Sequence, residues 1–103
     1  MNNMNQLMKQ AKKLQEDMAK AQEELEHSTV IGAAGGGVVE IEMTGAKVAT
    51  AVRIKPEALA QGDVEVLEDL VLAAIADAQA KADALAQERL GKYTKNLNMP
   101  GLF

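Results

Sequence analysis

The sequence predicts an α+β fold: a long N-terminal helix, a three-stranded antiparallel sheet and a long C-terminal helix. Residues 38–54 read VVEIEMTGAKVATAVRI, two alternating runs around a glycine turn. Alternation with period two is typical of half-buried strands. Before and after this stretch, apolar residues recur every three or four positions, which is the helical period. A two-stranded hairpin is unstable alone, so we expect the flanking helices to cover it.

The size and composition indicate one domain. The chain has 103 residues, and we expect 1–103 to form a single unit in which 95–103 is a flexible tail. It has no cysteine, which excludes disulfides and cysteine zinc sites. Neither a signal peptide nor a membrane span is visible, so we expect a cytoplasmic protein.

The first helix is predicted over residues 4–25. Its apolar residues follow a 3-4 spacing, the a and d positions of a heptad: Met4, Leu7, Ala11, Leu14, Met18, Ala21 and Leu25. Such a narrow stripe favours packing on another helix as much as on a sheet. His27 follows the helix. It could be a ligand or a general base, but a position at a helix C-terminus is the better interpretation.

The strands follow the first helix. Residues 28–31 predict a short edge strand, and the glycine-rich residues 32–37 predict a flexible connector rather than a phosphate loop, because no Lys-Ser/Thr follows. In the hairpin, a four-residue turn at 44–47 would place Val48, Thr50 and Val52 opposite Met43, Ile41 and Val39. The prolyl bond after Lys55 ends the third strand.

The second long helix is predicted from Val64 to near Tyr93, with Asp63 as its N-cap. Its apolar face is broad and rich in alanine, which would let a neighbouring element approach closely. Glu65, Glu68 and Asp69 could bind a metal, but acids in a first turn also complement the helix dipole, which we favour.

Charge is distributed unevenly along the chain. The net charge of −4 divides into +2 over residues 1–20, −9 over 21–88 and +3 over 89–103. Basic ends on an acidic middle indicate a polyanionic partner. Lys9, Lys12 and Lys13 form a cluster at i,i+3 and i,i+4 spacing, for which an ordinary solvated face is the alternative.

The lengths of the elements favour self-association. Each long helix would exceed about 30 Å, whereas strands of six or seven residues span roughly 20–24 Å. The helices must therefore overhang the sheet. An overhanging apolar seam needs a partner, and a second copy of the chain is the simplest one. We expect a homodimer with projecting helical ends.

Several segments together resemble the YbaB/EbfC family of bacterial nucleoid-associated proteins. They are residues 7–11 (LMKQA), 37–39 (GVV), 52–56 (VRIKP), 67–71 (LEDLV) and 97–102 (LNMPGL). The resemblance implies a tweezer-like α-β-β-β-α homodimer that binds double-stranded DNA without catalysis, cofactor or metal. It also implies a place in the nucleoid and a role in its organisation and in gene regulation. The DNA-contacting positions that it suggests are Lys9, Lys12, Lys13, Arg89, Lys92 and Lys95.

Two other classes of function are weaker. A prefoldin-like helical chaperone or protein-interaction module shares the helix–hairpin–helix outline and could present Met4, Leu7 and Met8 to a client. The helices are short for that class, and it gives the basic ends no role. An enzyme is not expected, because the sequence offers no nucleophile–base pair, metal spacing or phosphate loop.

Overall fold

The computed structural model describes residues 3–59 and 62–94. The elements, in chain order, are α1 (Asn3–Glu26), β1 (Thr29–Ala34), β2 (Val39–Thr44), β3 (Ala49–Ile54), α2 (Pro56–Leu59) and α3 (Val64–Thr94). This order confirms the predicted fold class. The expected tail, residues 95–103, lies outside the described residues.

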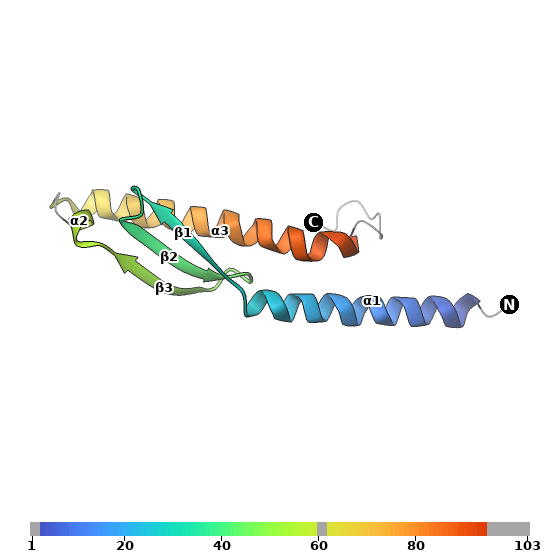
Figure 1. The fold of residues 1–103 in the computed structure, drawn as a ribbon. Coiled ribbons are helices and arrows are strands. Elements are labelled where there is room, and N and C mark those ends of the chain that lie inside the picture. Colours follow the sequence, from blue (N-terminus) through green and yellow to red (C-terminus); the bar gives the residue numbers. More distant parts are fainter. Residues whose placement is uncertain (1–2, 60–61, 95–103) are drawn as a thin grey trace.

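The molecule is elongated, with extents of 74 × 25 × 16 Å. α3 crosses one face of the sheet and continues beside α1, and the first half of α1 extends beyond the end of α3 (Figure 1). We call β1–β3, α2 and α3 the body, residues 16–26 the root of α1, and residues 3–15 the tip of α1. Of the helices in the described ranges, none has both the length and the apolarity to cross a bilayer.

The core lies between β2 and α3. Val39, Ile41 and Met43 alternate along the central strand, and all three side chains are buried. α3 meets them with fully buried alanines, Ala74, Ala78 and Ala82. Small side chains on α3 let its backbone approach the sheet closely, as the alanine-rich pattern predicts.

The closest approach is at Gly32 of β1. A Cβ atom there would lie 2.3 Å from the Ala78 nitrogen and 2.4 Å from the Ala74 oxygen. Residues 32–34 therefore belong to a strand packed on α3, and the prediction of a flexible connector over 32–37 is wrong for them. The turn is confined to residues 35–38, of which the three glycines have positive φ. Composition alone does not distinguish a packing glycine from a flexible one.

The hairpin register differs from the prediction by two residues. Ile41 pairs with Val52 and Val39 with Ile54. The turn is closed by a hydrogen bond from Lys47 N to the Thr44 carbonyl, and Lys47 is left-handed with φ 67°. A bulge next to Glu42 and Met43 adds a further residue on β3. The turn and the bulge together shift the pairing without changing which face is apolar.

The bulge also changes the environment of one predicted apolar-face residue. The Thr50 hydroxyl donates to Glu42 Oε2 at 2.7 Å, so it lies with the polar side chains. Arg53 pairs with the same carboxylate at 3.4 Å. The Thr50 hydrogen bond and then Arg53 hold the pKa of Glu42 below its ordinary value of 4.5.

The β1 edge of the sheet is covered by polar side chains from α3. At the β1 edge, Ala33 N donates to Asp77 Oδ2 at 2.9 Å and Lys81 Nζ donates to the Ile31 carbonyl at 2.8 Å. Both side chains come from α3, and they form an ion pair at 3.0 Å. The Ala33 hydrogen bond, and then Lys81, hold the pKa of Asp77 below 3.8. α3 thus blocks this edge with side chains.

The end of α1 is fixed to the hairpin turn. Gly45 N donates to the carbonyls of both Leu25 and Ser28 at 3.0 Å. A Cβ at Gly45 would lie 2.7 Å from the Leu25 oxygen, so the turn fits against α1 only without a side chain. Ser28 Oγ also bonds the Glu24 carbonyl at 2.8 Å. This contact sets the direction in which α1 leaves the body.

Candidate nucleic-acid interface

The charge of α1 changes sign along its length. The tip, residues 3–15, carries three lysines and no acid. The root, residues 16–26, carries five acids and one lysine. Charges on one helix act over about one Debye length, roughly 10 Å at 0.1 M salt, so the tip presents a positive potential of its own.

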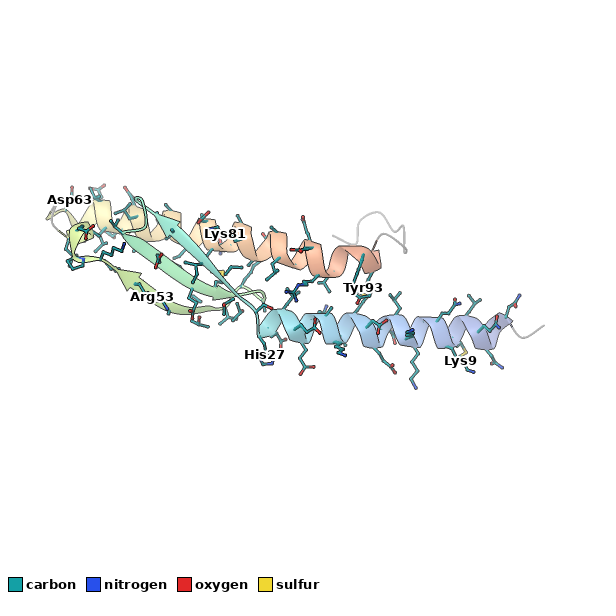
Figure 2. The ribbon with its side chains drawn as sticks, in the orientation of Figure 1. Lys9, His27, Arg53, Asp63, Lys81 and Tyr93 are labelled. Atoms are coloured by element: carbon teal, nitrogen blue, oxygen red, sulfur yellow. The ribbon has the colours of Figure 1, made fainter. Side chains whose placement is uncertain are left out.

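The three lysines of the tip are Lys9, Lys12 and Lys13. All are exposed, and they lie on neighbouring helical positions away from the heptad seam. Within the described parts of the chain, no carboxylate lies within ion-pair distance of them. Figure 2 labels Lys9 near the free end of α1, far from the sheet. Their ammonium groups are available to an external anion.

The basic residues of the body are mostly paired. Lys47 pairs with Asp83, Arg53 with Glu42 and Lys81 with Asp77. Among the described body residues, Lys55 and Lys92 have no carboxylate partner. This contrast separates the tip lysines, which have no local partner, from bases that stabilise the fold.

Arg89 and Lys92 do not join the tip cluster. Arg89 Nη1 lies 3.9 Å from Glu24 Oε2, beside the root of α1. Lys92 Nζ lies 5.1 Å from the centre of the Tyr93 ring, at the end of α3 (Figure 2). Eleven residues of helix, about 16 Å, separate Glu24 from Lys13. Lys95 lies outside the described residues.

One exposed lysine was not among the expected site residues. Lys20 follows Lys13 by seven residues, two turns, and therefore lies on the same side of α1. Glu16 and Glu24 stand four residues before and after it, so its potential is largely offset. The seven-residue spacing is the sequence signal that places Lys20 on the side of Lys13. Because Glu16 and Glu24 offset its charge, Lys20 adds little to the positive potential of the tip.

The other candidate residues, within the described ranges, are not arranged as a catalytic or metal-binding site. His27 is exposed just after α1, and among residues 3–59 and 62–94 no side chain forms a hydrogen bond or ion pair with its imidazole that would make it a base. Asp63 Oδ1 accepts from Glu65 N at 3.0 Å, which confirms the N-cap. Across residues 3–59 and 62–94, no group of three His, Asp or Glu side chains is arranged to hold a metal ion.

Comparison with known proteins identifies relatives over almost the whole chain. The model of the YbaB/EbfC DNA-binding family matches residues 1–97. A nucleoid-associated protein of Bacillus thuringiensis is 52% identical over 98% of this chain and 93% of its own. One from Pelotomaculum thermopropionicum is 46% identical over 98% and 96%.

A solved structure shares the fold. The uncharacterized protein HP0035 from Helicobacter pylori superposes with a TM-score of 0.70, covering 91% of this chain and 96% of its own, at 18% sequence identity. The family model and the relatives agree over the same span as this fold. The chain belongs to the YbaB/EbfC DNA-binding family.

Proposed function

We propose that the protein binds double-stranded DNA as a homodimer, through phosphate contacts of Lys9, Lys12 and Lys13 on each of two α1 tips. The observation that carries the proposal is that these three neighbouring lysines are all unpaired, in contrast to Lys47, Arg53 and Lys81 of the body. Ammonium groups without a local carboxylate can neutralise phosphates and displace the cations condensed on DNA, and the release of these cations drives binding.

Arg89, Lys92 and Lys95 are proposed as secondary contacts. Arg89 shares its charge with Glu24 at 3.9 Å, a pair that is exposed enough to exchange for a phosphate. Lys92 lies near the end of α3, where DNA held between two tips would pass. We expect each of these residues to contribute less than a tip lysine.

The dimer is supported by an apolar surface beside α3, where the helix does not cover β3. Val52 and Ile54 pair with the buried residues Ile41 and Val39 yet remain 55% and 41% exposed. On α3, the exposed Leu72 and Val64 are centred on the side opposite Asp77, which faces the β1 edge. The β3–α3 surface comprises Val52, Ile54, Leu59, Val64 and Leu72.

A single chain leaves these five apolar side chains exposed, and we propose that they form one patch of the kind that marks an interaction site. A two-fold axis through it would let each copy cover the other's β3. The dimer would then present two tips to one duplex. Two weak contacts held together bind far more tightly than either alone.

The dimer interface has its own test. Val52→Asp and Leu72→Asp should each convert the dimer to a monomer in light scattering coupled to gel filtration. Ile31→Asp is the matched control, because Ile31 is also exposed but lies on the opposite face of the sheet. Monomers in all three variants and in the unaltered protein would contradict the interface.

Association with the nucleoid, with roles in its organisation and in gene regulation, follows as a proposal from the same binding. The relatives from Bacillus and Pelotomaculum are called nucleoid-associated proteins. Phosphate contacts carry no sequence information, so we expect modest sequence preference and binding at many sites.

The deciding experiment is fluorescence anisotropy with a labelled duplex across a salt series. Binding should weaken log-linearly with salt, with a slope of about −0.9 per phosphate contacted. Lys9, Lys12 and Lys13 changed together to Gln should weaken binding and flatten the slope. The control, Lys47, Arg53 and Lys55 changed to Gln, removes the same charge from the body.

The two triple variants separate local contact from net charge. Equal losses in both would show that overall charge, and not the tip, drives binding. If the unaltered protein fails to bind at low salt, the proposal is wrong. The chaperone alternative would then be favoured, and it is tested by suppression of aggregation of an unfolded client.

A further inference from the structure

The heptad seam of α1 is partnered at the root and unpartnered at the tip. Ala21 and Leu25 are buried, and Leu14 and Met18 are half-buried. Met4, Leu7 and Met8 are 59–72% exposed. One continuous stripe therefore packs within the chain and then runs on into solvent. Lysines alone would suffice for phosphate contact, so DNA binding does not explain the apolar half of the tip.

The positions beside the exposed seam carry no charge. With Met4 and Leu7 at a and d, the flanking e and g positions of the tip are Asn3, Met8, Gln10 and Gln15. In coiled coils these positions set partner choice through their charges, and like charges there would repel a second copy. Here a second tip meets amide and thioether side chains, which impose no repulsion.

The lysines lie away from this seam. Lys9 falls at f, Lys12 at b and Lys13 at c, the outward positions of a heptad. Two tips that pack seam to seam would therefore keep all their lysines outside the contact. Pairing of tips and binding of phosphate use different sides of one helix, so they can occur together.

A groove of about 400 Å³ lies beside the seam rather than on it. It is lined by Met8, Lys9, Ala11, Lys12 and Gln15, so of its lining only Ala11 belongs to the seam. The groove therefore lies on the lysine-bearing side of the tip, outside the surface that two tips packed seam to seam would bury.

We infer that α1 tips of neighbouring dimers pair with each other on DNA, so that bound dimers are linked along or between duplexes. This inference rests on the proposed DNA binding. The tip has 13 residues, whereas a stable interface uses about 20–30 residues a side, so the pair is weak in solution. It forms when DNA holds two dimers close and raises their effective concentration.

Cooperativity separates tip pairing from DNA binding. Met4, Leu7 and Met8 changed together to Gln keep helix propensity and charge but remove the seam. On a duplex that holds one dimer, this variant should bind as the unaltered protein does. On a duplex several times longer, the Hill coefficient should fall from above 1 to about 1. Asn5→Gln, an off-seam change in the same tip, should retain cooperativity.

Crosslinking locates the contact. The chain has no cysteine, so Leu7→Cys places a single thiol on the seam and Asn5→Cys places one off it. With a short bismaleimide, Leu7→Cys should give covalent pairs on the long duplex, whereas Asn5→Cys should not. Crosslinking of Leu7→Cys that is equally efficient without DNA would place the contact inside one dimer and overturn the inference.

The remaining outcomes are also decisive. Unchanged cooperativity in the Gln variant, or non-cooperative binding by the unaltered protein, would contradict tip pairing while binding to the short duplex still supported the proposed function. Failure of the unaltered protein to bind the short duplex would remove both. Restored cooperativity on returning Leu7 alone would identify the d position as the main contact.

Discussion

The body and the tip of α1 differ in how far their apolar and charged side chains find partners within the chain. In the body, β2 is buried against the alanines of α3, and four of the six described bases are paired with acids. At the tip, apolar side chains and lysines are both exposed. The body satisfies its groups internally, whereas the tip leaves them for partners. Exposed apolar and charged groups that contribute nothing to the isolated fold are candidates for binding a partner.

The largest difference should appear in truncation of apolar residues. Ile41→Ala removes a fully buried side chain from the centre of the core and should cost about 2–5 kcal/mol of unfolding free energy. Leu7→Ala at the exposed tip should change it by less than about 0.5 kcal/mol. Urea denaturation of both variants measures the contrast. A large loss in Leu7→Ala would show that the tip is packed in the free protein.

The next largest effect should come from closing the space at Gly32. Gly32→Ala places a methyl 2.3 Å from the backbone of α3, which must shift, at a cost of about 1–3 kcal/mol or more. Gly91→Ala is the matched control, because an added Cβ there meets nothing within 4 Å and alanine favours helix by about 1 kcal/mol. Thermal melts should move in opposite directions.

A smaller effect, confined to acid, should come from Asp77. Its pKa is lowered in the folded state, so its contribution to stability is present above the ordinary pKa of 3.8 and is lost as pH falls through the lower folded value. Asp77→Asn should therefore lose less stability than the unaltered protein between pH 5 and pH 2. Melting temperatures across that range test it. Parallel pH profiles would exclude Asp77 as a contributor.

The smallest effect on stability should come from the tip lysines. Lys12→Gln should leave the unfolding free energy within about 0.5 kcal/mol, because no ion pair is lost. The same change should reduce the salt slope of DNA binding by about 1 for each phosphate contact removed. A changed salt slope with an unchanged melting temperature would show that Lys12 contributes to DNA binding and not to the stability of the fold.

The sequence predicts the elements better than their contacts. Helix periodicity placed both long helices within about two residues, because 3.6-residue periodicity over many turns is hard to mistake. The register of β3 was missed by two residues, since it depends on the left-handed Lys47 and a bulge. The tight packing at Gly32 depends on where α3 crosses the sheet, and local pattern carries no information about that.

The sequence likewise predicts one part of the candidate site and not the other. Helical spacing is enough to group Lys9, Lys12 and Lys13, because they lie within two turns of one helix. It is not enough to place Arg89, whose position beside Glu24 depends on the path of α3 across the body. The pairing of the body lysines also needed coordinates. This pairing distinguishes the tip cluster from Lys47, Arg53 and Lys81.

Because α1 is attached to the body through Gly45, a small change in its angle there would move its far end by a large distance. Its 24 residues extend about 36 Å from a pivot made by one amide and two carbonyl oxygens. A tilt of roughly 10° at this pivot would sweep the far end through on the order of 6 Å, more than the 3.4 Å rise of a DNA base pair. In the proposed dimer, the distance between the two tips would therefore be set at the hairpin turn, at the opposite end of α1 from the lysines.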